Sequence, residues 1–345
     1  MKTLLIIGGA GFTGTNFADH YLKQGHKVVV VDNLSRKGCL ENISYLQQHT
    51  NSADLDIVIS DILKPNTAFV AAIEQADAVF HFAGQVAVTT SVANPREDFE
   101  INALGTFNVL EMIRNSKGNK PPLFFSSTNK VYGGMEDIKV VEQADRYAYK
   151  DYPLGIAEDR LLDFHSPYGC SKGAADQYVR DYARVYGLKT VVFRQSCIYG
   201  YRQFGIEDQG WVAWFTIAAF LGKPITIYGD GKQVRDVLFI SDLVNAYDLA
   251  LQNIDSISGD IFNIGGGPAN TISLLNLIDF LSTELQITFD ISYDDWRTGD
   301  QPVYISDIRK AGHRLGWTPK TSWNEGVRKL AHWVESNKAM LAKIF

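Results

Sequence analysis

Cysteine is scarce in this sequence, with only 3 among 345 residues. Cys39, Cys170 and Cys197 lie far apart, their number is odd, and no Cys-x-x-Cys pair occurs. A disulfide framework needs paired cysteines, and a structural zinc site needs closely spaced ligands. We therefore expect three ordinary thiols and no bound metal.

The sequence also has no excess of basic residues. Lys and Arg number 33 against 39 Asp and Glu, the formal net charge is -6, and basic clusters such as Arg36-Lys37 are two residues long. A nucleic-acid-binding protein usually needs a basic stripe that displaces counterions from phosphates. We therefore expect no nucleic-acid partner, and any anionic ligand must be held locally.

Long hydrophobic runs are missing as well. The longest candidate, Trp211 to Leu221, includes Thr216 and is shorter than the roughly 18 apolar residues that a membrane-spanning helix needs. The first residues, Met1 to Ile7, lack the long apolar region and the small-residue cleavage site of a signal peptide. We expect no membrane insertion and a cytoplasmic location.

Hydrophobic residues make up 46% of the chain, and before residue 200 they form short apolar runs that alternate with amphipathic stretches. Strands buried on both faces and joined by helices give this pattern. The strand-like runs are Thr3 to Ile7, Lys27 to Val31, Asp56 to Ile59, Ala78 to Phe82, Leu123 to Ser126 and Thr190 to Phe193. Asn94 to Lys117 and Pro167 to Tyr186 are helical in composition. The sequence predicts an α/β fold with a Rossmann-type, doubly wound parallel sheet.

The pattern changes near residue 200. Beyond it, glycines interrupt shorter elements, and amphipathic stretches follow at Leu274 to Leu285, Asp307 to Leu315 and Asn324 to Asn337. We predict a Rossmann domain over residues 1–200, to which segments around 235–265 return. Residues 201–345 are expected to form a smaller, mostly helical C-terminal lobe.

The first strand runs directly into a glycine-rich turn, Gly8-Gly9-Ala10-Gly11-Phe12-Thr13-Gly14. Glycines in this position let backbone N–H groups approach a pyrophosphate at the start of a helix. Asp32 ends the second strand, where its carboxylate can accept the hydroxyls of an adenosine ribose. Because that charge repels a 2′-phosphate, the pattern favours NAD over NADP, although Arg36 and Lys37 could neutralise such a phosphate.

A second constellation, Tyr168-Gly169-Cys170-Ser171-Lys172, falls inside a predicted helix. Its four-residue spacing puts the phenol and the ammonium on one helical face, where Lys172 can lower the pKa of Tyr168 and so make a base of the phenolate. The same spacing recurs at Tyr228 and Lys232, but in a glycine-rich turn that offers no common face. We therefore expect catalysis at the first pair.

The fifth strand ends in a run of hydroxyl-bearing residues, Ser126, Ser127 and Thr128. In a doubly wound sheet the carboxyl ends of the strands meet at the ligand crevice. A hydroxyl there can hold a substrate oxygen while the phenolate removes its proton. The alternative is that these hydroxyls only cap a turn.

The glycine loop, the strand-end carboxylate, the hydroxyl and the helical Tyr/Lys pair, in this order, resemble the extended short-chain dehydrogenase/reductase family of nucleotide-sugar enzymes. The resemblance covers nearly the whole chain and includes His81 to Gln85, Asn102 to Thr106 and Gln233 to Val237. It implies that Thr128, Tyr168 and Lys172 are catalytic and that Lys172 also holds the nicotinamide ribose of NAD. The NAD-binding residues that it implies are Gly8, Gly11, Phe12, Thr13, Gly14, Asp32, Asn33, Asp61, Ile62, Phe82, Ala83, Gln85, Asn102, Tyr168 and Lys172.

Three stretches resemble a subgroup of this family that inverts C2 of a CDP-deoxyhexose, CDP-paratose or CDP-tyvelose. They are Ser127 to Gly133, Asp163 to Gly173 and Asp208 to Trp211. Related 4,6-dehydratases carry an Asp-Glu pair after the strand-end Thr, where this chain has Asn129 and Lys130. Elimination of water then lacks its proton carriers, so oxidation and re-reduction of one carbinol is the simpler chemistry. The resemblance implies an isomerase that acts through a 2-keto sugar, in the synthesis of lipopolysaccharide O-antigen.

Two alternatives stay open. Another epimerase, a reductase or a dehydratase could share the scaffold, and the last two would consume reduced cofactor or expel water. A non-catalytic NAD-sensing protein could also keep the fold, although the intact set of Thr128, Tyr168 and Lys172 argues against it.

The diphosphate of a nucleotide sugar needs cations. Arg235 and Arg297 are the candidates, the latter in Arg297-Thr298-Gly299-Asp300-Gln301, which is similar to the family's late nucleotide-binding motif. Guanidinium groups suit phosphate oxygens, but both arginines could instead form salt bridges, for example with Asp236 or Asp300. The predicted substrate-binding residues are Thr128, Asn129, Arg235 and Arg297. Relatives pair through the two helical stretches named above, so the resemblance also implies a homodimer or homotetramer.

Overall fold

The computed structural model describes residues 1–49, 51–288, 290–297 and 299–345, so Thr298 of the predicted nucleotide-binding motif lies outside the described residues. The chain forms two compact units, each assembled from separate stretches of sequence. The first unit consists of Met1–Val131, Ser166–Arg194 and Val244–Phe262, and the second of Tyr132–His165, Gln195–Leu243 and Asn263–Phe345.

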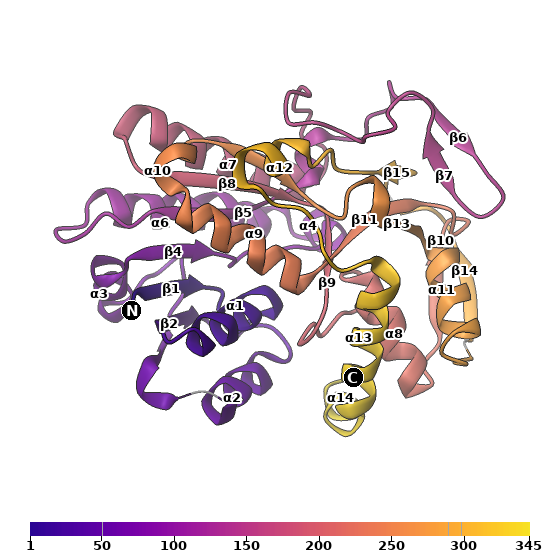
Figure 1. Cartoon of the computed structure of the whole chain (residues 1–345), viewed down its shortest axis with the longest axis horizontal. Coiled ribbons are helices and arrows are strands. Elements are labelled where there is room, and N and C mark those ends of the chain that lie inside the picture. Colours follow the sequence, from indigo (N-terminus) through magenta and orange to yellow (C-terminus); the bar gives the residue numbers. More distant parts are fainter. Residues whose placement is uncertain (50, 289, 298) are drawn as a thin grey trace. The chain divides into compact units, whose positions relative to one another are not determined.

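The secondary structure follows the chain as labelled in Figure 1. The strands are β1 (Thr3–Ile7), β2 (Lys27–Asp32), β3 (Leu55–Ile59), β4 (Ala78–His81), β5 (Leu123–Thr128), β6 (Val140–Glu142), β7 (Tyr147–Tyr149), β8 (Thr190–Gln195), β9 (Cys197–Tyr199), β10 (Ile225–Tyr228), β11 (Val234–Phe239), β12 (Ile261–Ile264), β13 (Thr271–Ser273), β14 (Ile291–Asp294) and β15 (Val303–Tyr304). The α-helices are α1 (Phe12–Lys23), α2 (Cys39–His49), α3 (Thr67–Gln75), α4 (Val88–Ala93), α5 (Pro95–Phe99), α6 (Gly105–Arg114), α7 (Ser166–Tyr186), α8 (Trp211–Leu221), α9 (Ile240–Gln252), α10 (Ile254–Ile257), α11 (Leu274–Thr283), α12 (Arg309–Leu315), α13 (Trp323–Ser336) and α14 (Lys338–Ile344). The turns η1 (Ser52–Asp54), η3 (Asn129–Tyr132) and η4 (Pro268–Asn270) are 3₁₀-helical, and η2 (Glu100–Leu104) is π-helical.

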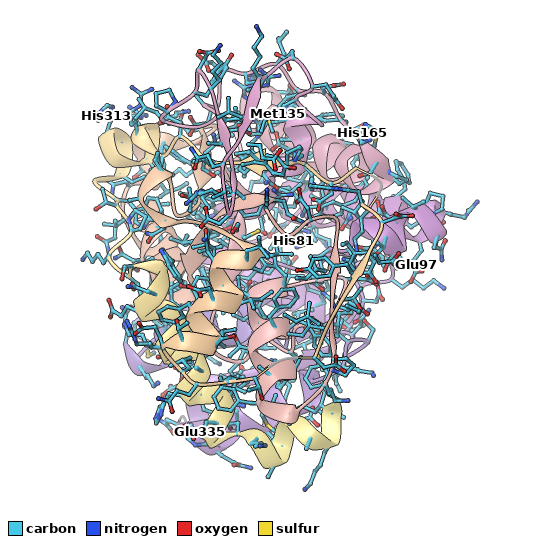
Figure 2. The ribbon with its side chains drawn as sticks, turned by 90° about the vertical axis from the view of Figure 1, so that its right-hand side faces the viewer. His81, Glu97, Met135, His165, His313 and Glu335 are labelled. Carbon is cyan, nitrogen blue, oxygen red and sulfur yellow. The ribbon has the colours of Figure 1, made fainter. Side chains whose placement is uncertain are left out.

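A seven-stranded sheet with the order β12-β8-β5-β4-β1-β2-β3 organises the first unit. Leu5 of β1 pairs in parallel with Val29 of β2 and Val79 of β4. Figure 1 shows β1 between these two strands. The strand order reverses between β1 and β4, which makes the carboxyl edge there the place where a doubly wound sheet binds ligands. β4 ends at His81, which lies in the interior (Figure 2). The predicted fold class is confirmed.

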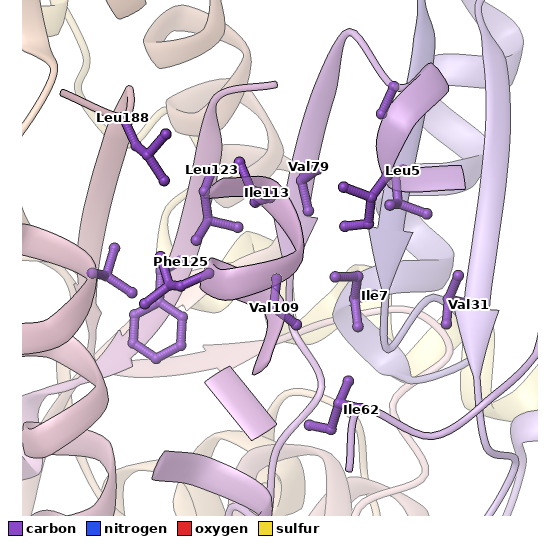
Figure 3. Packing of buried hydrophobic residues seen from close by; sticks show 14 of the residues in the cluster. Leu5, Ile7, Val31, Ile62, Val79, Val109, Ile113, Leu123, Phe125 and Leu188 are labelled. Carbon is purple, nitrogen blue, oxygen red and sulfur yellow. The ribbon is translucent and has the colours of Figure 1, made fainter. Parts of the chain in front are cut away.

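The two faces of this sheet bury different side chains. On one face Leu5, Val79 and Leu123 pack against Val109 and Ile113 of α6 (Figure 3). On the other face aromatic rings dominate, from Phe17 of α1 to Tyr247 of α9, whose ring centroids are 5.0 Å apart. Each such side chain contributes about 1.5–3 kcal/mol when fully buried. The carboxyl edge is therefore a rigid platform for the loops that follow the strands.

The predicted helix from Asn94 to Lys117 consists of three consecutive segments, α5, η2 and α6. In the π-helical turn the Gly105 N–H donates to the Glu100 carbonyl, five residues earlier. The Thr106 hydroxyl also donates to the Asn102 carbonyl at 2.7 Å. Single π-helical turns inside α-helices often mark functional sites, and this one carries Asn102.

The second unit contains short strands and several helices. Its sheets are β10-β14, β6-β7, and a third in which β11 pairs with β9, β13 and β15. The three amphipathic stretches predicted beyond residue 270 correspond to α11, α12 and α13. None of the helices in the described part of the chain combines the length and hydrophobicity that crossing a bilayer requires.

A buried ion pair ties α7 to the sheet. Arg194 of β8 donates from Nε and Nη2 to the two carboxylate oxygens of Asp176, both at 2.9 Å, and the side chains are 2% and 0% exposed. The Ser127 hydroxyl at the end of β5 donates to the same carboxylate at 2.7 Å. The Arg194 guanidinium therefore orients structure next to the candidate catalytic residues.

Replacing Asp176 by alanine should lower the free energy of unfolding by about 3–5 kcal/mol, because the Arg194 charge would stay buried without its partner. Urea denaturation measures this change. The matched control is Asp255→Ala, which breaks the pair of Asp255 with Lys189, side chains that are 82% and 52% exposed. That control should cost less than about 1 kcal/mol. Equal losses in both variants would show that the buried pair has no special role.

Candidate active site

The glycines in the turn between β1 and α1 are of two kinds. Gly8 has a φ of +80°, and a Cβ there would lie 2.5 Å from the Ala83 nitrogen, while a Cβ on Gly14 would lie 2.3 Å from the Gly8 oxygen. A Cβ on Gly11 would meet only the Gly8 oxygen, at 3.3 Å. The fold thus requires glycine at positions 8 and 14, whereas Gly11 keeps open the space above the first turn of α1.

That first turn contains Phe12 and Thr13, and its N-cap Gly11 offers no side-chain oxygen to the backbone N–H groups. Unpaired N–H groups and the helix dipole make such an N-terminus a site for a phosphate group. An anionic ligand can therefore bind here without a basic side chain, although the chain has a formal net charge of -6.

Asp32 connects this turn to the loop after β2. Its Oδ2 accepts the Ala10 N–H at 3.0 Å and its Oδ1 accepts the Leu34 N–H at 2.8 Å. Burial raises the pKa of Asp32, and these two backbone N–H groups oppose the rise. The carboxylate is thereby held at the carboxyl edge of the sheet, where the sequence predicts the adenosine ribose.

The next loop brings Asn33, Asp61 and Ile62 together. The Asn33 amide donates to Asp61 Oδ2 at 2.8 Å. The Ile62 carbonyl accepts the Asn108 amide at 3.0 Å, and the Ile62 side chain packs so closely on α6 that a Cβ on Gly105 would lie 2.4 Å from its Cδ1. The loop after β3 is thus anchored to α6 beside Asp32.

The loop after β4 is held from two sides. The N–H groups of Phe82 and Ala83 both donate to the Ile7 carbonyl, at 2.8 and 3.0 Å. Asn102 Oδ1 accepts the Gln85 N–H at 3.0 Å, and its Nδ2 donates to the Gln85 carbonyl at 3.0 Å. Phe82, Ala83, Gln85 and Asn102 therefore lie together next to the glycine-rich turn.

The three predicted catalytic residues are buried at the end of β5 and in α7. Burial raises the pKa of Tyr168 to about 12, and a hydrogen bond with the Thr128 hydroxyl opposes that rise. Burial lowers the pKa of Lys172 to about 7, with Asp176 and Asp98 opposing. Lys172 Nζ donates to the Ser126 carbonyl and lies 4.3 Å from the centre of the Phe125 ring.

One expectation about this pair differs from the structure. Lys172 was expected to lower the pKa of Tyr168, but burial dominates, and among the described groups those that oppose it are Thr128 and Arg36. The physical reason is that both side chains are desolvated and Lys172 directs its ammonium at a backbone carbonyl and an aromatic face. Tyr168 is therefore a neutral phenol at pH 7 in this structure.

Several residues of the site were given no role of their own by the sequence analysis. His81 lies 3.1 Å from the Thr106 hydroxyl, and burial lowers the pKa of this imidazole to about 3, so it is neutral. The Ser91 hydroxyl of α4 accepts the Tyr168 N–H at 3.1 Å. Asp98 and Ser171 form a buried hydrogen bond beside Lys172. A single polar residue in an amphipathic stretch looks like a solvated one, and only the packing of the helices reveals these contacts.

The predicted substrate-binding residues are divided between the units. Asn129 in the first unit is buried, and its Oδ1 accepts the Thr128 hydroxyl at 3.3 Å. In the second unit Arg235 pairs with Asp300 at 2.5 Å. Arg297 pairs there with Asp208 at 2.9 Å and lies 3.8 Å from the centre of the Tyr228 ring. Both arginines thus form salt bridges in this structure.

The donor set of the first unit fits NAD. It combines the space above Gly11, the N-terminus of α1 and a buried Asp32 with Tyr168 and Lys172 on the neighbouring α7. In the parts of the chain that the structure describes, no three His, Cys, Asp or Glu side chains gather as metal ligands would. All three cysteines are free thiols.

Known proteins resemble this chain along nearly its whole length. A family model described as the NAD dependent epimerase/dehydratase family matches residues 4–265. A CDP-paratose 2-epimerase of Salmonella typhi is 47% identical over 340 residues, which are 96% of this chain and 99% of that protein. A UDP-glucose 4-epimerase of Thermotoga maritima, crystallised with UDP-glucose, has a TM-score of 0.80 at 30% identity and covers 97% of this chain and 99% of its own. A UDP-glucuronic acid 4-epimerase of Bacillus cereus, in complex with UDP-glucuronic acid and NAD, has a TM-score of 0.82 at 26% identity with the same coverage of 97% and 99%.

Gly11→Ala should separate binding from folding. The added methyl group would lie 3.3 Å from the Gly8 oxygen, which a small shift relieves. It occupies the space of the pyrophosphate, so NAD affinity should fall at least about tenfold, which corresponds to 1.4 kcal/mol. The free energy of unfolding should change by less than about 1 kcal/mol. Calorimetric titration with NAD and urea denaturation measure the two effects. Gly312→Ala in α12 is the control, since its Cβ would lie 3.6 Å from the Trp317 oxygen. Unchanged NAD affinity in Gly11→Ala would contradict this position for the pyrophosphate.

Proposed function

The chain belongs to the NAD dependent epimerase/dehydratase family, and from this premise we propose that it is an isomerase that inverts C2 of a CDP-deoxyhexose, interconverting CDP-paratose and CDP-tyvelose. The observation that carries the proposal is the 47% identity to a CDP-paratose 2-epimerase over 96% of the chain. The Asn129-Lys130 pair supports it, because a dehydratase would need carboxylates at these positions.

The chemistry of C2 explains why such an enzyme needs NAD. The C2 hydrogen of a pyranosyl diphosphate is not next to a carbonyl, so a side chain of ordinary basicity cannot remove it as a proton. When bound, NAD supplies a positive charge and an acceptor for this hydrogen as hydride, which it returns to the 2-keto sugar. Delivery to the other face of the ring inverts C2, with no net oxidation.

In this proposal the residues of the first unit handle the proton. Thr128 holds the C2 oxygen, and Tyr168 takes the proton of that hydroxyl and gives it back after re-reduction. A positive charge close to the phenol lowers its pKa from the value near 12 in this structure, which prepares Tyr168 to act as the base. Lys172, one helical turn away, supplies part of that charge when it is protonated and also holds the nicotinamide ribose.

The two units divide the binding work. The first unit is the NAD-binding domain, with the glycine-rich turn holding the pyrophosphate and Asp32 holding the adenosine ribose. The second unit holds the nucleotide sugar, where Arg235 and Arg297 exchange their carboxylate partners, Asp300 and Asp208, for the diphosphate. Since NAD and CDP-sugars are cytoplasmic metabolites, we place the enzyme in the cytoplasm, in the synthesis of O-antigen sugars.

We further propose that two copies of the chain pair through α6 and α7. The outer faces of these helices and the preceding turn expose apolar side chains, namely Leu104, Phe107, Tyr178, Val185 and Tyr186. The rings of Phe107 and Tyr178 touch edge to face, with centroids 5.8 Å apart, and so join the two helices in one patch. A patch of this kind on a soluble domain marks an interaction surface, and a twofold axis through it gives a closed dimer.

The double variant Phe107→Glu and Tyr178→Glu should convert the dimer to a monomer, because four charges would face one another across the twofold axis. Light scattering after gel filtration measures the mass. Ile59→Glu, at an exposed apolar position of β3, is the control that should keep the mass of the parent protein. A dimer that survives the double variant would place the interface elsewhere.

The purified protein should interconvert CDP-paratose and CDP-tyvelose without added reductant, because the cofactor is regenerated in each turnover. In D₂O the product should carry no deuterium at C2, since the hydrogen passes to the cofactor and back. Proton NMR and mass spectrometry measure both results. Deuterium at C2 would mean deprotonation, and consumption of NAD(P)H in proportion to product would mean a reductase.

Tyr168→Phe should lower turnover at least about 100-fold while the protein still binds NAD.

A further inference from the structure

A buried carboxylate, Asp98, lies beside the predicted catalytic helix and has no part in the steps above. It belongs to α5 and is 1% exposed, whereas the adjacent Glu97 lies at the surface (Figure 2). Asp98 Oδ2 accepts the Ser171 hydroxyl, and Oδ1 accepts the Asn102 amide at 3.1 Å. An ionisable group is rarely buried so completely without a partner or a function.

The hydrogen-bond partners of Asp98 connect α7 with the loop after β4. Ser171 directly precedes Lys172 in α7, and its Oγ is also 3.2 Å from the Tyr168 carbonyl. Asn102, in the π-helical turn, donates from Nδ2 to Ser171 Oγ at 3.1 Å. Its Oδ1 accepts the Gln85 N–H and so holds the loop after β4. Asp98 therefore fixes the position of the α7 turn that carries the Tyr/Lys pair relative to the loop after β4.

The ionisable side chains that face Asp98 belong to α7. From α7 it faces Lys172 and Tyr168, while α4, with the sequence VTTSVA, adds no ionisable side chain. On η2, Glu100 pairs with Arg96 at the surface at 2.9 Å. The charge of Asp98 is thus directed at the Tyr/Lys pair.

Among the described residues Asp176 is the other acidic neighbour of Lys172, and it raises the pKa of Lys172 more than Asp98 does, although it also forms a bidentate pair with Arg194. His81, packed nearby, is neutral. The oxygens of Asp98, by contrast, accept hydrogen bonds from the neutral side chains of Ser171 and Asn102. Its negative charge therefore adds to that of Asp176 where both act on Lys172.

We propose that Asp98 is a buried counter-charge of the Tyr168–Lys172 pair and, through Ser171, extends the pH range in which Lys172 is protonated. It is a positioning residue, because it touches neither substrate nor cofactor. This inference rests on the proposed function for the roles of Tyr168 and Lys172. The directions of the shifts agree with it, since Asp98 raises the pKa of both groups.

The sign of the expected effect follows from charge alone. Asp98→Asn removes a negative charge and keeps the shape, so the pKa of each neighbouring group must fall. In the proposed mechanism the active form carries the phenolate of Tyr168 and the ammonium of Lys172, so the titrations of these two groups set the two limbs of the activity profile. Both limbs should therefore move to lower pH together, which a merely structural defect would not produce.

The direct test is an NMR titration of Lys172 in protein labelled with ¹³C at lysine Cε, with its resonance assigned by Lys172→Arg. Asp98→Asn should lower the pKa of Lys172 by about one unit or more. Asp98→Glu, which keeps the charge, should titrate close to the parent protein. Glu97→Gln removes one charge from the exposed face of the same helix and should have no effect, because solvent screens that position. An unchanged pKa in Asp98→Asn would overturn the inference.

The second measurement is the pH profile of kcat/KM with CDP-paratose for the same variants. A shift of both limbs by at least about half a pH unit in Asp98→Asn supports the inference, and a profile that falls in height without moving contradicts it. Full activity in Tyr168→Phe would instead refute the proposed function. The titration of Lys172 would then still test whether Asp98 raises the pKa of that lysine. If Asp98→Asn does not fold, as judged by circular dichroism, Asp98→Ser is titrated in its place.

Discussion

Desolvation of Tyr168 and Lys172 is the constraint on which the site depends. The same burial raises the pKa of the phenol to about 12 and lowers that of the ammonium to about 7, so burial disfavours the charged form of each group. Small changes in nearby charge then decide which of them is ionised. A cationic cofactor and a substrate hydroxyl that arrive together can make the base where and when it is needed.

The sheet makes this burial possible. Parallel strands covered on both faces end in a rigid edge, and α7 is tied to that edge by the Asp176–Arg194 pair and by Ser127. The glycine-rich turn serves the same purpose for anions, because backbone N–H groups at a helix N-terminus hold phosphate without added positive charge. An acidic chain can therefore bind a dinucleotide.

Much of the fold could be predicted because hydrophobic periodicity depends on local sequence. The apolar runs from Thr3 to Phe193 mark six of the seven strands within a few residues, while β12, which follows a short helix late in the chain, was not singled out as a strand. The π-helical turn was also not foreseen, since Asn94 to Lys117 keeps a helical composition throughout. Motif spacing indicated Thr128, Tyr168 and Lys172, but Asp98 and Ser91 meet α7 only through tertiary packing. The predicted direction of the Tyr168 pKa shift was wrong, because the spacing of Tyr168 and Lys172 shows which groups are close but not how far the fold buries them.

The central claim is that C2 is inverted by a hydride that leaves and returns. It is tested most directly by mixing the NAD-loaded enzyme with one equivalent of CDP-paratose and following the absorbance of reduced nicotinamide in a stopped-flow instrument. The account predicts an absorbance that rises and decays within a single turnover and that is absent in Tyr168→Phe. Formation of CDP-tyvelose at the normal rate with no transient reduction of the cofactor would contradict it.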